Sequence, residues 1–105
     1  TFINFYMINT TITTHNIKAK LIEQLSIYYL DIADDSQKHI GHNKTSEGGH
    51  YTIMLVSNVF NKMKLIDRHK LIYKILDNMI GTEIHAISIK AYSIKEYKSF
   101  RNYGK

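Results

Sequence analysis

The sequence predicts one α+β domain in which helices cover one face of a three-stranded mixed sheet. Two segments, one from Asn16 and one from Leu65 onward, place apolar residues at the spacing of a helix face. Three other segments are short and rich in β-branched or large apolar residues, as strands are. A short helical segment closes the chain. The resulting order is helix, strand, strand, helix, strand, helix, and it predicts the α+β class.

The N-terminal third is predicted to hold an arm, a helix and a strand. Residues 1–13 are rich in Asn and Thr without a sustained period, so we expect a flexible arm there and a folded domain over residues 14–103. The helix that begins at Asn16 has an apolar face formed by Ile17, Leu21, Ile22 and Leu25. Residues 28–33 alternate enough to predict a strand, which ends at the turn-forming residues 34–36.

A long polar loop follows and leads to the middle of the sheet. It closes at Gly48-Gly49, and its length of about fourteen residues exceeds that of an ordinary hairpin connection. Residues 51–56 predict a second strand, antiparallel to the first. Residues 65–80 trace a helical face, and Gly81 stands where a glycine commonly ends a helix.

The last two elements complete the sheet and cover it. Residues 83–91 predict a third strand, which should run parallel to the second because a strand–helix–strand crossover joins them. Residues 93–100 predict a terminal helix, with Ser93 as its cap and Glu96 three residues later to complete a capping box.

Composition narrows the functional classes. The net charge of +5 favours acidic partners or nucleic acid. The chain is also rich in Lys, Asn, Ile and Tyr and has no Pro, which is the residue bias of an AT-rich genome, so part of the basic charge is attributed to that bias. The absence of cysteine excludes disulfides and thiol nucleophiles. No apolar run approaches the roughly 18 to 20 residues that span a bilayer, so no membrane partner is expected. Thr1 suggests a trimmed chain, for which Met7 would be the native start.

Histidine is the residue type most able to carry chemistry in this chain. The polar loop contains His39 and His42 and is followed by His50, and His85 begins the last apolar segment. Imidazole is the commonest metal-ligating side chain. Without a thiolate, any soft-metal site must use histidine or take sulfur from a partner. A metal-dependent hydrolase built on these four histidines is the least favoured hypothesis, because no general base accompanies them.

Three segments together resemble the BolA family. They are Asp34-Asp35-Ser36-x-x-His39-x-Gly41-His42, then Val56-Ser57-x-x-Phe60 with Arg68-His69-Lys70-Leu71-Ile72-Tyr73, and finally Ile84-His85-Ala86-Ile87-Ser88-Ile89. The similarity extends from about Ile17 to Tyr97. It implies a class II KH-like αββαβα fold, which agrees with the element order above.

The resemblance implies an adaptor rather than an enzyme. BolA proteins pair with monothiol glutaredoxins, and the heterodimer shares a [2Fe–2S] cluster with glutathione. For this chain the resemblance implies His85 as the principal ligand and His39 as the loop ligand. Because His42 is an additional loop histidine, it is the alternative to His39, and His50 is expected to support the ligands without binding iron. Histidine can replace cysteine on one iron and raises the reduction potential.

The same resemblance implies the wider setting. The chain is expected to be monomeric and without cofactor when alone, and to act in cluster trafficking, cluster assembly or iron-status regulation. Cytoplasmic and mitochondrial family members share these motifs, so both compartments fit.

The alternative function is that of a DNA-binding transcriptional regulator. The turn and helix over residues 60–76 could meet phosphates or a groove through their basic residues, which are Lys62, Lys64, Arg68, Lys70 and Lys74. These charges have no interleaved aromatic stacking platform, and the Gly-x-x-Gly clamp of KH domains is missing. The basic face could equally dock an acidic patch on glutaredoxin.

Overall fold

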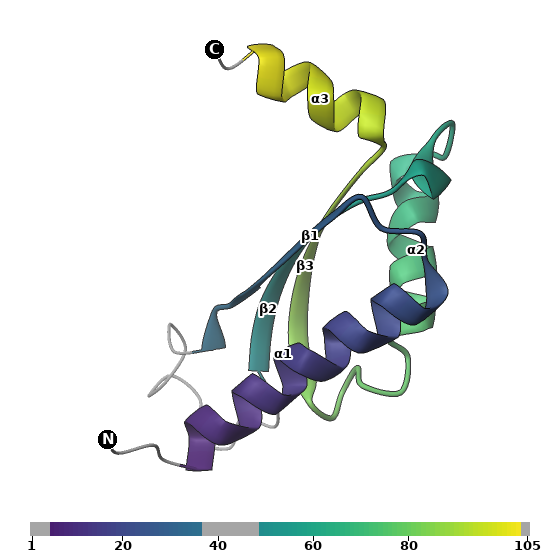
Figure 1. The fold of residues 1–105 in the computed structure, drawn as a ribbon. Helices are drawn as coiled ribbons and strands as arrows, with labels where there is room; N and C mark the ends of the chain where they lie inside the picture. The colour runs from purple at the N-terminus through teal and green to yellow at the C-terminus, as the bar shows by residue number, and fades with distance from the viewer. Residues whose placement is uncertain (1–4, 37–48, 104–105) are drawn as a thin grey trace.

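The computed structural model describes residues 5–36 and 49–103, and they form a three-stranded mixed sheet with three helices. The elements in chain order are α1 (Phe5–Gln24), β1 (Tyr29–Asp34), β2 (Gly49–Val56), the short 3₁₀ helix η2 (Asn58–Phe60), α2 (Leu65–Ile75), β3 (Ile84–Tyr92) and α3 (Ile94–Tyr103). The strand order is β1-β2-β3, with β1 antiparallel and β3 parallel to the central β2. The predicted α+β class and mixed sheet are therefore confirmed (Figure 1).

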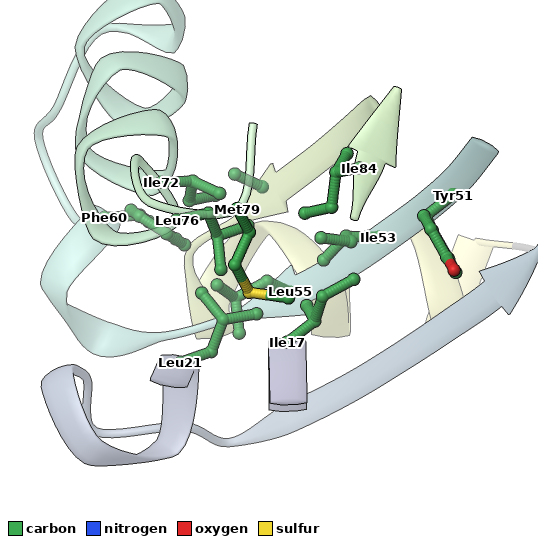
Figure 2. Close-up of a cluster of buried hydrophobic side chains, with 11 residues drawn as sticks. Ile17, Leu21, Tyr51, Ile53, Leu55, Phe60, Ile72, Leu76, Met79 and Ile84 are labelled. Atoms are coloured by element: carbon green, nitrogen blue, oxygen red, sulfur yellow. The ribbon is translucent and has the colours of Figure 1, made fainter. Parts of the chain in front are cut away.

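The core lies between the sheet and the helices α1 and α2. Alternate residues of β2 point into it, so Tyr51, Ile53 and Leu55 are buried while His50, Thr52 and Met54, which alternate with them, are only partly covered. Figure 2 shows these side chains meeting residues of both helices, of the turn after α2 and of β3. The other core residues are Ile17, Leu21, Phe60, Ile72, Leu76, Met79, Ile84 and Ala91. As expected, α1 and α2 therefore cover the same face of the sheet.

Helix α3 lies beyond the end of the strands (Figure 1). The rings of Tyr97 and Phe100 contact those of Tyr29 and Tyr92, respectively. Ala91, the neighbour of Tyr92, points into the core. Because successive strand residues point to opposite faces, α3 packs against the far side of the sheet at one end. The expectation that the helices cover one face therefore holds for α1 and α2 but is wrong for α3.

Three helix boundaries differ from the sequence predictions by three residues or more, and one of them is the end of α3, which lies at Tyr103 instead of residue 100. The expected arm over residues 1–13 is wrong as to secondary structure, since α1 already begins at Phe5 and Thr13 within it is only 6% exposed. Helix α2 ends at Ile75 rather than before Gly81. Gly81 has a φ of +88°, but it lies in the turn that leads into β3, where its N–H donates to the carbonyl of Ile84.

The inward face of α2 also differs from the one its apolar residues predicted. Leu65 and Ile66 are 65% and 58% exposed, whereas Arg68 and Ile72 are buried. The guanidinium of Arg68 donates hydrogen bonds to three residues. Its Nε donates to the carbonyl of Met63 at 3.0 Å, and its Nη1 donates to the buried carbonyl of Ala91 at 3.0 Å. Both guanidinium ends also bind a carboxylate on α3.

That carboxylate belongs to Glu96, which serves two structural purposes. It accepts from Arg68 Nη1 at 2.7 Å and from Nη2 at 3.0 Å. It also accepts from the backbone N–H of Ser93 at 2.8 Å, while the Ser93 hydroxyl accepts from the N–H of Glu96 at 3.1 Å. The predicted capping box is confirmed, and the same glutamate anchors the buried arginine.

Acid is expected to remove the contribution of Glu96 to stability. Hydrogen bonds from Arg68 and from the backbone of Ser93 lower the pKa of Glu96 from 4.5 to about 2. A carboxyl whose pKa is lowered by folding stabilises the fold fully above its unfolded pKa, and this contribution is lost as the pH falls from 4.5 through 2. Urea unfolding at a series of pH values should show Glu96→Gln to be less stable than wild type at neutral pH, with a difference that shrinks in acid. A difference that does not change with pH would contradict the assignment.

Candidate functional site

Two histidines that are far apart in the sequence lie side by side at one end of the sheet. The ring centroids of His50 and His85 are 5.1 Å apart, with the ring planes tilted by 47°. A shift in the β2–β3 register brings them together: Gly49 pairs with Ile84 and His50 pairs with Ala86, so that His85 has no partner across the ladder. Such a bulge re-aims a side chain at a strand end. His85 is exposed and His50 is half-buried.

The start of the loop is fastened to β2 next to this histidine pair. The Ser36 hydroxyl accepts from the N–H of His50 at 3.0 Å, and the N–H of Asp35 donates to the His50 carbonyl at 2.7 Å. The hydroxyl of Thr52 donates to Asp35 Oδ2 at 2.6 Å, and Asp34 Oδ1 accepts from the N–H of Ser36 at 2.9 Å. These carboxylates thus act as turn and cap groups, as the sequence predicted, rather than as an acid–base pair.

The loop returns to the sheet through a glycine that has no room for a side chain. A Cβ on Gly49 would lie 2.5 Å from Ser36 Oγ and 2.7 Å from the hydroxyl of Tyr51. The N–H of Gly49 donates to the carbonyl of Glu83 at 2.9 Å, which fixes it against the start of β3. Both ends of the histidine loop are therefore held beside His85 by close packing.

Gly49→Ala should consequently destabilise the protein by about 1 to 3 kcal/mol, the usual cost of forcing an added methyl into a packed site. The midpoint of urea unfolding measures this loss. In a Tyr51→Phe background, which lacks the hydroxyl at 2.7 Å, the same substitution should cost less. An alanine variant as stable as wild type would show that the close approach of these groups is not real.

The predicted ligands are only partly placed by the structure. His50 and His85 come together, whereas His39 and His42 lie outside the described residues. Within residues 5–36 and 49–103, no group of three or more His, Asp or Glu side chains is arranged to hold a metal ion. The described part of the chain thus offers two adjacent imidazoles, of which His85 is open to solvent. The exposed His85 imidazole fits one iron of a histidine-ligated [2Fe–2S] cluster whose other ligands come from elsewhere.

The structure divides the basic residues predicted for the alternative function. The prediction that Arg68 contacts nucleic acid is wrong. Arg68 is 4% exposed and its guanidinium is held by Glu96 and backbone carbonyls, so it cannot reach a phosphate. The remaining basic residues of the set are exposed, and they are Lys62, Lys64, Lys70 and Lys74. An open groove of about 650 Å³ on α2 is lined by Lys70, Tyr73, Lys74, Ile75, Asp77, Asn78 and Ile80.

The sequence of the chain matches one family model and is similar to several known proteins. A family model described as BolA-like protein matches residues 21–96. An uncharacterized protein of Buchnera aphidicola from Acyrthosiphon pisum is 34% identical over 86 residues, which cover 82% of this chain and 81% of that protein. The DNA-binding transcriptional regulator BolA of Escherichia coli is 28% identical over 86 residues, which cover 82% and 80% of the two chains.

Solved structures agree with the sequence matches. The BolA domain of SufE1 from Arabidopsis thaliana superposes with a TM-score of 0.69 at 34% identity, covering 78% of this chain and 92% of that one. The solution structure of mouse BolA1 gives a TM-score of 0.69 at 28% identity, with 83% and 69% coverage. None of the described helices is long and apolar enough to cross a membrane.

Proposed function

The chain belongs to the BolA family, and from this premise we propose that it is an adaptor, not an enzyme, that shares a [2Fe–2S] cluster with a monothiol glutaredoxin and glutathione. The glutaredoxin cysteine and the glutathione thiol supply the sulfur ligands that this cysteine-free chain lacks. Histidine ligation on one iron raises the reduction potential relative to an all-thiolate cluster.

The observation that carries the proposal is the exposed His85 imidazole beside His50. A ligand shared with a second protein must be reachable from solvent, and His85 meets that condition at the edge of the domain. His50 contacts its ring and is itself held through its backbone by Ser36 and Asp35, so it can fix the orientation of His85. Such supporting contacts set the geometry of metal-binding histidines.

Chain connectivity supports a second ligand from the loop. His39 stands three residues after Ser36, and three residues of fully extended chain span at most about 10 Å. Ser36 itself bonds to the backbone of His50, which adjoins His85. His39 is therefore the first choice for the loop ligand, with His42 as the alternative.

Reconstitution tests the proposal directly. The chain is mixed with a monothiol glutaredoxin, glutathione, ferrous iron and sulfide, and visible circular dichroism is compared with that of glutaredoxin reconstituted alone. A changed spectrum, together with a one-to-one complex by size exclusion, is the expected result. An unchanged spectrum at saturating chain would contradict cluster sharing, whether or not the two proteins associate.

The cellular role follows from the same chemistry. We propose a monomer that forms a heterodimer with its glutaredoxin in the cytoplasm or in mitochondria, and that serves cluster trafficking, assembly or iron-status regulation. Delivery and sensing differ in one observable. Delivery requires loss of the cluster to an acceptor protein, whereas sensing requires that the complex retain it.

A second candidate function, binding of duplex DNA, is favoured by the name of the Escherichia coli relative, DNA-binding transcriptional regulator BolA. The exposed lysines on and before α2 provide a surface for it. Binding of this kind falls steeply with added salt because counterions are released from the phosphates. Replacing Lys70 and Lys74 by alanine should reduce the salt dependence, whereas cluster sharing should depend on glutathione and iron and be unaffected.

A further inference from the structure

A cluster of tyrosines and cations at the junction of β1 and α3 lies outside both functions considered above. An open groove of about 560 Å³ is lined there by Tyr28, Tyr29, Tyr97, Lys98, Arg101 and Asn102. We refer to it as the tyrosine groove. Its volume falls within the range of ligand-binding pockets in proteins.

The centre of the tyrosine groove is a fixed aromatic ring. Tyr97 is only 8% exposed, and the ring of Tyr29 stacks on it with centroids 5.5 Å apart and planes within 18°. Arg101 donates to the Tyr97 hydroxyl at 3.0 Å, and its guanidinium carbon lies 5.5 Å from the ring centroid. Tyr97 and its two neighbours, Tyr29 and Arg101, thus form the floor of the groove.

The aromatic ring of Tyr28, at the outer side of the groove, is exposed to solvent. Tyr28 meets Tyr97 edge-on at a centroid distance of 6.2 Å, yet 51% of it is exposed. The Lys98 ammonium lies 5.7 Å from the Tyr28 centroid, and Lys98 is exposed. Tyr29 also remains 42% exposed. Packing of α3 against the sheet explains why Tyr97 is buried, but it leaves much of the Tyr28 and Tyr29 rings exposed.

Aromatic rings with free surface, placed among cations, are the means by which proteins hold single-stranded nucleic acid without sequence preference. Bases stack on the rings, and the cations meet the phosphates. Duplex DNA offers no free base faces, so it could use only the cations. The chain's net charge of +5 adds long-range attraction for a polyanion.

We propose that the tyrosine groove binds single-stranded nucleic acid, with a base stacked on Tyr28 and the backbone phosphates met by Lys98 and Arg101. An acidic peptide would use the same two cations but would gain nothing from the exposed ring. The proposal is independent of cluster sharing and of the lysines on α2.

Fluorescence anisotropy of a labelled oligothymidine of about twelve nucleotides, a length in the range that such surfaces occupy, tests the proposal. Tyr28→Ala should weaken binding about tenfold, within the measured range for loss of one stacked base, while Tyr28→Phe should bind as wild type does. Lys98→Ala should weaken binding and lower the slope of log affinity against log salt by about 0.7. Far-ultraviolet circular dichroism checks that each variant is folded.

Two comparisons separate the alternatives. The same oligonucleotide in duplex form should bind more weakly, and polyglutamate should fail to displace the single strand at equal charge. Binding that Tyr28→Ala leaves unchanged, or equal affinity for polyglutamate, would overturn the proposal and leave a surface for acidic proteins. Binding abolished by Lys70→Ala and Lys74→Ala but not by the groove variants would overturn it in favour of the α2 surface.

Discussion

Replacement of Arg68 by alanine is expected to lower the free energy of unfolding by about 2 to 4 kcal/mol, because several hydrogen bonds to one charged, buried group are lost together. The guanidinium joins α2 to the carbonyl of Ala91 on β3 and to Glu96 on α3. Its carbon also lies 5.9 Å from the centroid of the buried Phe60 ring. The variant leaves the buried Ala91 carbonyl without this donor. Urea unfolding followed by far-ultraviolet circular dichroism measures the loss.

Neighbouring variants identify the cause of that loss. Arg68→Lys keeps the charge but lacks the planar fork, so it should recover only part of the stability. Lys70→Ala, on an exposed basic residue of the same helix, should change stability by no more than about 0.5 kcal/mol. If Arg68→Ala were equally neutral, the buried network would be contradicted. A DNA-binding defect in an Arg68 variant would therefore report a damaged fold rather than a lost phosphate contact.

The sheet and the last helix could be predicted because their signals are local. The three strands begin and end within two residues of their predicted bounds, and the capping box of Ser93 and Glu96 is a four-residue pattern. The start of α1 was missed because its first residues are rich in Asn and Thr, which have modest helix propensity. The end of α2 was missed because apolar spacing continues into the turn that carries Leu76 and Met79 to the core.

The features of the candidate sites that the sequence did not predict depend on contacts between distant parts of the chain. Arg68 resembled a surface residue because its partner, Glu96, is 28 residues away and was interpreted only as a cap. The adjacency of His50 and His85 depends on a register shift that strand periodicity does not reveal. The aromatic contacts of α3 left a weak signal, since Tyr97 and Phe100 are three residues apart on one helix face.

The three proposed functions are assigned to three separate sets of residues, so each set can be tested by substitutions that leave the others unchanged. The proposals assign the histidine pair to cluster sharing, Lys70 and Lys74 to duplex DNA, and the tyrosine groove to single strands. Arg68 belongs to none of these surfaces, because its guanidinium is buried and paired with Glu96.

His85→Ala is expected to abolish the change that the chain causes in the visible circular dichroism of a glutaredoxin-bound cluster. The exposed imidazole is the proposed ligand from β3, and no thiolate in this chain can replace it. Because the side chain is exposed, its removal should change the free energy of unfolding by no more than about 0.5 kcal/mol. The spectrum should then match that of glutaredoxin reconstituted alone, while urea unfolding of the variant remains close to that of wild type.

Other histidine variants show whether the effect belongs to His85 itself. His15→Ala, which removes an exposed imidazole from α1, should leave the spectrum unchanged. His50→Ala should weaken cluster retention without abolishing the spectrum, since His50 contacts the ring of His85. Whichever of His39→Ala and His42→Ala loses the spectrum identifies the loop ligand. If folded His85→Ala still gives the wild-type spectrum, His85 is not a ligand, and His50 becomes the candidate because, within residues 5–36 and 49–103, it is the imidazole that lies against that ring.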